Sequence, residues 1–200
     1  ADSPPLSFGD SPLRIEDVVA VARRQRGVAL SADAAFRARI TRGTEFLDRL
    51  LREDGVVYGV TTGYGDSCTV VIPPDLLTEL PHHLFTYHGC GLGRFLDADE
   101  TRAVLAARLA SLSIGMSGVS LPLLESLVTL LQQDILPLIP AEGSVGASGD
   151  LTPLSYVAAV LCGEREVEYG LLGAGGRKEP RARRAARLLP ERCRLRSAWR

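Results

Sequence analysis

A stretch of glycine and other small residues, 142–154, separates two apolar segments of this chain. It reads Glu-Gly-Ser-Val-Gly-Ala-Ser-Gly-Asp-Leu-Thr-Pro-Leu, and its side chains are too small to form a core. Its three glycines permit backbone conformations and close approaches that a Cβ would hinder. Asp150 suits a helix N-cap and Pro153 suits a first helical turn, so we expect the loop to lead into the positive end of a helix.

Two interpretations of this loop follow from its residues. In the first, it is a tight turn or an anion-binding nest before a helix. In the second, Ala147, Ser148 and Gly149 react with one another. The unhindered Gly149 nitrogen attacks the Ala147 carbonyl carbon, water is lost to give an imidazolone, and Ser148 then loses its hydroxyl as water. The product, a methylidene-imidazolone, is an electrophile made from the backbone. The spacing alone leaves both interpretations open, because glycine-rich turns before helices are common.

The rest of the chain predicts a mainly α protein. Apolar periodicity predicts helices over about 15–24, 31–53, 76–84, 97–116, 123–135 and 151–162. Ser31 and Asp97 are the expected N-caps of the second and fourth helices, and Met116 is the last apolar residue of the fourth. Glycine-rich loops near 58–65, 88–93 and 143–149 interrupt the helices, and such loops on rigid elements are where sites tend to lie.

Composition narrows the class of partner. The net charge of −1 gives no general attraction to nucleic acid or to an anionic membrane. We see no signal peptide, and the most apolar stretch, 121–140, contains charged residues and prolines that argue against a membrane span. The four cysteines are widely spaced and form no CxxC pair, so we expect a reducing, cytoplasmic location.

The chain divides into three regions by composition. We expect a flexible arm at 1–12, a main region at 13–169 and a basic tail at 170–200. Residues 171–200 contain ten Lys and Arg but two Asp and Glu, whereas residues 1–170 contain thirteen and twenty-two. Three interpretations of the tail stay open: a nucleic-acid-binding segment, a disordered end, or the product of a reading-frame slip in a GC-rich gene.

Three segments together resemble the aromatic amino acid ammonia-lyase family, which includes histidine, phenylalanine and tyrosine ammonia-lyases and related aminomutases. They are Tyr58-Gly-Val-Thr-Thr-Gly-Tyr-Gly65, His88-Gly-Cys-Gly-Leu-Gly93 and the loop at 143–154, and Met116-Ser-Gly-Val-Ser120 is also similar. The resemblance covers about 13–166. It implies the N-terminal part of the helical, aspartase/fumarase-like fold of that family, and it favours the self-modifying interpretation of the loop.

The resemblance also implies a mechanism. Ala147, Ser148 and Gly149 would form the methylidene-imidazolone, with no external cofactor, and the substrate amine would add to its methylene carbon. Tyr58 would remove a proton from the substrate β-carbon, and loss of the amine would give ammonia and the α,β-unsaturated acid. Because an ordinary tyrosine has a pKa of about 10, the site would have to stabilise its phenolate. From the residue alone, a half-buried tyrosine beside a glycine turn is the simpler interpretation of Tyr58.

His88 matches the position where family members recognise the substrate, and histidine there resembles the histidine enzymes. Thr61 instead resembles the phenylalanine enzymes. We expect elimination of ammonia from histidine or a related aromatic L-amino acid, with a tyrosine or phenylalanine ammonia-lyase or a 2,3-aminomutase as the alternative. From the residue alone, His88 is also readable as a helix-end histidine near free carbonyls. We expect no metal, because the adjacent His82 and His83 point to different helix faces and nothing completes a ligand set.

The family is much longer than this chain. Its C-terminal half carries the core helices of a homotetramer and the arginine that holds the substrate carboxylate, and neither can be assigned here. Family sites combine residues of more than one subunit, so we expect Tyr58 and the imidazolone to meet across an interface. The resemblance is to enzymes of amino-acid catabolism, and these 200 residues alone are expected to lack part of the active site of such an enzyme. A non-catalytic helical remnant is the alternative from another class.

Overall fold

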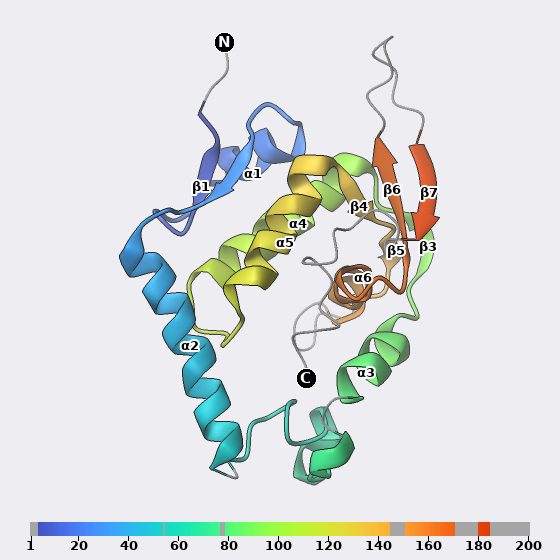
Figure 1. Cartoon of the computed structure of the whole chain (residues 1–200). Coiled ribbons are helices and arrows are strands. Elements are labelled where there is room, and N and C mark those ends of the chain that lie inside the picture. Colours follow the sequence, from blue (N-terminus) through green and yellow to red (C-terminus); the bar gives the residue numbers. More distant parts are fainter. Residues whose placement is uncertain (1–3, 54, 77–78, 145–150, 171–179, 185–200) are drawn as a thin grey trace.

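The computed structural model describes residues 4–53, 55–76, 79–144, 151–170 and 180–184 (Figure 1). Its helices are α1 (Ile15–Ala22), α2 (Ala34–Arg52), α3 (Leu80–His88), α4 (Ala98–Ser113), α5 (Leu121–Gln133) and α6 (Leu151–Leu161), with 3-10 turns at Gly65–Thr69 and Pro74–Leu76. Its strands are β1 (Leu6–Phe8), β2 (Val28–Leu30), β3 (Leu92–Phe95), β4 (Ile135–Pro137), β5 (Pro140–Glu142), β6 (Glu166–Gly170) and β7 (Pro180–Arg184). The described part of the chain is mainly α, as the sequence predicts.

The core forms around α4 and α5, which lie side by side across the centre of Figure 1. Their facing residues Leu105, Leu109, Leu124, Leu127 and Leu131 are at most 2% exposed. Burying each such side chain contributes about 1.5–3 kcal/mol, so the contact between these two helices is a large stabilising term. Helix α1 packs against α4, and α3 packs against α6.

Short strands join distant segments around this helical core. The pairs are β1 with β2 in parallel (Leu6 opposite Val28), β3 with β5 antiparallel (Leu92 opposite Glu142), and β4, β6 and β7 antiparallel (Ile135 opposite Tyr169, Val167 opposite Arg183). The pairing of β3 with β5 matters for function. It places the segment that follows His88 beside the segment that leads into the glycine-rich loop.

The helix starts test the predicted caps. Asp97 is confirmed as the cap of α4, because its carboxylate accepts the Glu100 N–H at 2.8 Å and the Glu100 carboxylate accepts the Asp97 N–H in return. Ser31 was the wrong choice for α2. The Asp33 carboxylate accepts the Phe36 N–H at 3.0 Å, and the Ser31 hydroxyl accepts the Asp33 N–H, so the helix begins two residues later.

Other boundaries differ from prediction for local reasons. Helix α3 begins at Leu80 and has Pro81 in its first turn, where a missing N–H costs nothing. Helix α4 ends before Gly115, whose φ of +85° is left-handed, and this leaves Met116 85% exposed after the helix. In the basic tail, residues 180–184 form β7, although the sequence indicated no regular structure there.

Candidate active site

A cavity of about 710 Å³ lies between the glycine-rich loop after α2, helix α3 and the first residue of α6. Among the predicted site residues, Tyr58 and His88 both line it. Ala147, Ser148 and Gly149 lie outside the described residues, but Leu151, at the start of α6, also lines the cavity. The structure thus brings the predicted base, the predicted recognition residue and the end of the glycine-rich loop to one place.

Tyr58 sits on a loop that is held by its own side chains. The Val57 N–H donates to the Thr61 hydroxyl at 2.8 Å, and the Gly59 N–H donates to the Thr62 hydroxyl at 3.2 Å. The Gly65 N–H donates to the Tyr58 hydroxyl at 2.9 Å, while the Tyr58 side chain is 64% exposed. The Tyr58 oxygen therefore faces one backbone dipole of the kind that stabilises developing negative charge.

Thr61, whose identity argued for a phenylalanine-type enzyme, does not line this cavity. Its hydroxyl accepts the Val57 N–H and is 3.3 Å from the Gly55 carbonyl oxygen. In the structure the residue shapes the loop.

Tyr64 is the site residue that the sequence analysis missed. Its aromatic ring stands edge-on to both the Tyr58 ring and the His88 ring, with centroid separations of 6.3 Å in each case. Burial raises the pKa of Tyr64 above its usual value, and the neighbouring Tyr58 raises it further. Tyr64 is thus held as a neutral phenol beside Tyr58. A second tyrosine within the same glycine-rich loop was the signal available in the sequence.

His88 ends α3 and is half-buried. Its Nδ1 lies 3.1 Å from the Leu84 carbonyl oxygen. Because a carbonyl oxygen only accepts hydrogen bonds, Nδ1 carries the proton in this contact, and in the uncharged tautomer that has its proton on Nδ1 the Nε2 atom is an acceptor. Tyr64 and Tyr87 pack edge-on against the imidazole and fix its orientation.

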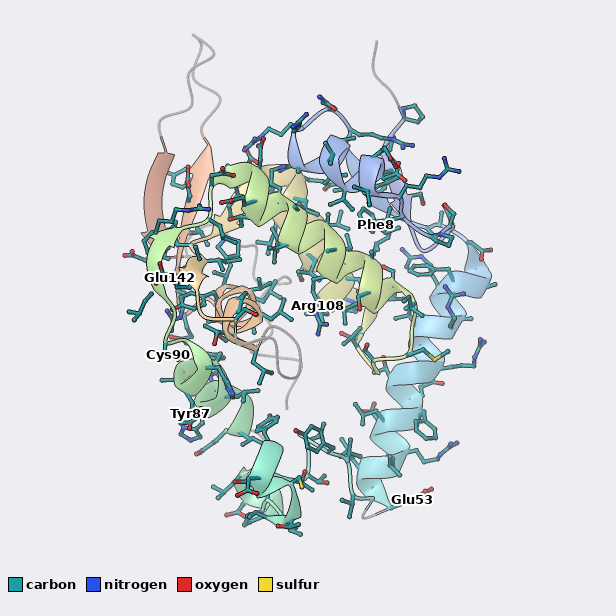
Figure 2. All side chains as sticks on the ribbon, turned by 180° about the vertical axis from the view of Figure 1, so that it is seen from behind. Phe8, Glu53, Tyr87, Cys90, Arg108 and Glu142 are labelled. Carbon is teal, nitrogen blue, oxygen red and sulfur yellow. The ribbon has the colours of Figure 1, made fainter. Side chains whose placement is uncertain are left out.

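A second, apolar cavity of about 310 Å³ adjoins the first, and Leu84, His88 and Leu151 line both. Arg108 enters it from the side of α4 that faces α6 (Figure 2). Arg108 makes no hydrogen bond or ion pair with another described residue, and burial lowers its pKa. Half of the other lining residues are leucine and most of the rest are also apolar, so the cavity suits the apolar face of an aromatic group.

The two ends of the glycine-rich loop meet next to these cavities. A Cβ placed on Gly143 would lie 2.6 Å from Cγ2 of Thr152, in the first turn of α6, and 3.4 Å from Cα of Gly91. The chain thus leaves and re-enters the described structure at neighbouring points. The described surroundings thus hold the two ends of the loop close together, which is compatible with the predicted imidazolone.

Two other features, a metal site and a membrane-spanning helix, can be compared with the parts of the chain that the structure describes. No group of three His, Cys, Asp or Glu residues there could hold a metal ion. The His82 ring packs edge-on against the Phe85 ring, and His83 Nε2 lies 3.7 Å from Oε2 of Glu79. None of the described helices is long and apolar enough to cross a membrane.

The profile of the aromatic amino acid lyase family matches residues 13–195. The chain belongs to this family. A histidine ammonia-lyase of Deinococcus radiodurans is 41% identical to it over 160 residues, which are 80% of this chain and 30% of that protein. The tyrosine aminomutase of Streptomyces globisporus has a similar structure, with a TM-score of 0.78 and 34% identity over 92% of this chain and 32% of that one. The structure of a histidine ammonia-lyase of Trypanosoma cruzi is also similar, with a TM-score of 0.74 and 27% identity over 91% of this chain and 33% of that one.

The chain spans about a third of the length of the curated relatives it matches. Tyr58 and Leu151 nevertheless line the same cavity within this single chain. The expectation that Tyr58 and the imidazolone meet across a subunit interface stays a prediction.

Proposed function

We propose that this lyase-family chain carries part of an ammonia-lyase site for histidine or a related aromatic L-amino acid. The observation that supports this most directly is the shared cavity of Tyr58, His88 and Leu151. The reaction is a non-oxidative elimination that gives ammonia and an α,β-unsaturated acid. Curated relatives named histidine ammonia-lyase, about 40% identical, support histidine as the substrate.

In this proposal Ala147, Ser148 and Gly149 form a methylidene-imidazolone, and no external cofactor is used. The group supplies an electrophilic carbon that takes the substrate amine and makes it a better leaving group. The described residues around it serve to hold its loop. Gly143 leaves room for Thr152, and pairing of Leu92 with Glu142 fixes the strand that enters the loop.

Tyr58 is the proposed base for the proton on the substrate β-carbon. The Gly65 N–H at 2.9 Å favours negative charge on its oxygen. Tyr64 remains a neutral phenol beside it, because burial and the neighbouring Tyr58 raise the pKa of Tyr64. The two tyrosines therefore differ in their tasks: Tyr58 accepts the proton, and Tyr64 packs between it and His88.

His88 is the proposed contact for the substrate side chain. Its Nε2 is an acceptor, so it selects a side chain with a hydrogen-bond donor at the distal end. The imidazole N–H of histidine provides such a donor, and a phenylalanine ring does not. The phenol of tyrosine also provides one, and the similarity to a tyrosine aminomutase keeps a tyrosine lyase or 2,3-aminomutase as the second candidate.

We further propose that the site works in a cytoplasmic homotetramer of an amino-acid-degrading enzyme. Cys68 and Cys90 are exposed thiols, and a reducing compartment keeps such thiols out of disulfides. The remaining two-thirds of the relatives' length would supply further substrate contacts and the subunit core.

Intact mass tests the proposed prosthetic group. If the imidazolone forms, the purified chain weighs two waters less than its sequence predicts, and Ser148→Ala prevents formation of the methylidene. Tyr58→Phe is the matched control, because it removes the proposed base but leaves the three ring-forming residues unchanged. An unmodified mass for the wild type would favour the non-catalytic helical remnant.

A substrate panel tests the role of His88. Histidine, tyrosine and phenylalanine are offered to the wild type and to His88→Phe, and unsaturated acid, ammonia and β-amino acid are measured. Loss of one hydrogen bond in the reacting complex should lower kcat/KM for histidine by roughly tenfold to a hundredfold relative to phenylalanine. Unchanged selectivity would overturn the assignment of His88, and a β-amino acid product would identify an aminomutase.

A further inference from the structure

The turn after His88 is held by two side chains from other parts of the chain. Gly89 follows the last residue of α3, and its carbonyl oxygen accepts the Tyr156 hydroxyl at 3.1 Å and Arg165 Nη2 at 3.0 Å. Tyr156 belongs to α6, and Arg165 precedes β6. Two donors from separate segments leave this carbonyl little freedom to reorient.

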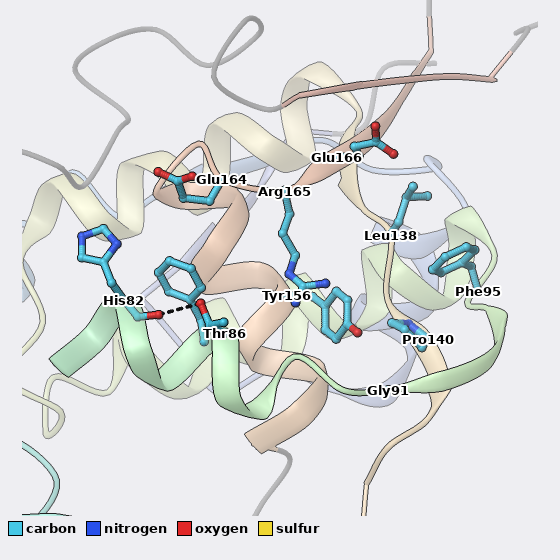
Figure 3. A pocket seen from close by; sticks show the side chains of 11 residues that line it. His82, Thr86, Gly91, Phe95, Leu138, Pro140, Tyr156, Glu164, Arg165 and Glu166 are labelled. Carbon is cyan, nitrogen blue, oxygen red and sulfur yellow. Dashed lines mark hydrogen bonds between the residues drawn. The ribbon is translucent and has the colours of Figure 1, made fainter. Parts of the chain in front are cut away.

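The two donors also hold each other. The Arg165 guanidinium lies 4.1 Å from the centroid of the Tyr156 ring, close enough for a strong cation–π contact. Figure 3 shows the Arg165 side chain reaching over Tyr156 between Glu164 and Glu166. Tyr156 is 6% exposed, so its ring is a fixed platform for the arginine.

Gly89 allows this contact because it has no side chain. A Cβ there would collide with the Arg165 guanidinium and would lie 2.6 Å from the Phe85 carbonyl oxygen. The arginine could move aside, but the helix carbonyl could not. A glycine at this position is therefore what lets Arg165 and Tyr156 reach the end of α3.

The same turn of α3 carries the group that orients His88. The imidazole Nδ1 donates to the Leu84 carbonyl, one helical turn before His88 itself. Tyr156 and Arg165 line a separate cavity of about 810 Å³, and no residue lines both that cavity and the one containing Tyr58 and His88. Their hydrogen bonds to Gly89 connect Tyr156 and Arg165 to the end of α3, where His88 lies.

We propose that Tyr156 and Arg165 are positioning residues for His88. By fixing the Gly89 carbonyl they keep the last turn of α3 in place, and with it the Nδ1–H bond to Leu84 that leaves Nε2 free as an acceptor toward the site. The functional value of this arrangement rests on the proposed role of His88 in substrate recognition. The structural effect does not depend on catalysis.

Nitrogen-15 NMR of the histidine side chains in the full 200-residue chain tests the proposal, with His88 assigned by its loss in His88→Gln. We expect the wild-type imidazole to be mainly the Nδ1–H tautomer. Tyr156→Phe removes one donor. Arg165→Gln replaces the guanidinium by a shorter, uncharged amide, which removes the cation–π contact and leaves no donor at the position of the guanidinium. Each should lower the ratio of Nδ1–H to Nε2–H tautomer by roughly twofold to tenfold, the range expected for loss of one hydrogen bond. Arg165→Lys, which keeps the charge and a donor, should lie closer to the wild type.

Arg39→Gln is the matched control. Arg39 also stacks on an aromatic ring, that of Phe36 at 5.4 Å, and also donates to a backbone carbonyl, that of Ile114 at 3.1 Å. It lies away from His88, so its loss should not change the tautomer ratio. A wild type without the Nδ1–H tautomer, or a ratio unchanged in folded Tyr156→Phe, would overturn the proposal. If Arg165→Gln does not fold, as judged by circular dichroism, the near-isosteric Tyr156→Phe decides. Since no imidazolone is needed, an unmodified mass would refute the proposed function and leave this test intact.

Discussion

Gly143→Ala probes the contact that brings the ends of the glycine-rich loop together. The new Cβ would lie 2.6 Å from Cγ2 and 3.2 Å from Cβ of Thr152, whereas nonbonded carbon atoms prefer about 3.5–4.0 Å. Thr152 is 9% exposed and belongs to the first turn of α6, so its methyl group has little room to turn away. Relief of the clash needs a shift of roughly 1 Å by the backbone at 143 or by α6.

Two terms of opposite sign set the stability of Gly143→Ala. Overpacking of this kind costs about 1–3 kcal/mol. Replacing glycine also restricts the unfolded chain, which stabilises the fold by about 0.4–1 kcal/mol where the backbone suits alanine. Gly143 is not among the glycines with positive φ, so its backbone is suitable and the clash alone is unfavourable. The net expectation is a loss of about 1–2 kcal/mol in the free energy of unfolding.

Thr152→Ser separates this clash from a general loss of stability, because it removes the Cγ2 atom that the new Cβ would meet. Alone, it should cost about 1 kcal/mol for a buried methyl group. In the double variant the same deletion relieves the clash, so the double variant should be at least as stable as Gly143→Ala. Urea denaturation gives the free energies, and intact mass gives the fraction of chains that lose two waters. Costs that simply add would refute the reasoning.

Two further predictions concern the scaffold. Arg102 is 4% exposed and donates to the carbonyls of Val21 and Leu131 and to the Asp134 carboxylate. Arg102→Met should therefore lower the free energy of unfolding, measured by urea denaturation, by about 3 kcal/mol. This is the lower end of the range for breaking a buried ion pair, because Arg24 still pairs with Asp134. Glu100 accepts from Arg94 and from the Asp97 N–H, which lowers its pKa from about 4.5 to about 2. The stability that the Glu100 carboxylate contributes is therefore complete above about pH 4.5 and is lost as the pH falls towards 2. Glu100→Gln should make the midpoint of urea unfolding less dependent on pH between these two values.

Local sequence signals predicted the elements well where one segment determines its own structure. Asp97 is the expected N-cap and forms a capping box with Glu100, and the helix predicted over 151–162 is α6. The helix predicted over 76–84 is α3, which begins four residues later at Leu80. The apolar pattern begins before Leu80, whereas Pro81 in the first turn fixes the start of the helix. Periodicity locates an apolar segment, but the cap and the first-turn proline decide where its helix begins.

The supports of the site could not be predicted in the same way. Tyr156 and Arg165 reach Gly89 across 67 and 76 residues of chain, and the Gly143 contact with Thr152 depends on where α6 begins. None of these has a periodicity or a motif, because each depends on the tertiary packing of α3 against α6. Residues with proposed chemical roles could be predicted from the sequence, whereas the residues that hold them in position are seen only in the structure.

Helix α6 connects these supports. Its first turn provides Leu151 to the cavity and Thr152 to the contact with Gly143, and its next turn provides Tyr156 to the carbonyl after His88. Because one short helix is rigid, the end of the glycine-rich loop and the end of α3 keep a fixed separation as long as α6 is folded. The separation of Leu151 from the carbonyl after His88 is therefore set within this chain. Missing subunit contacts should then weaken substrate binding and turnover without altering the tautomer of His88.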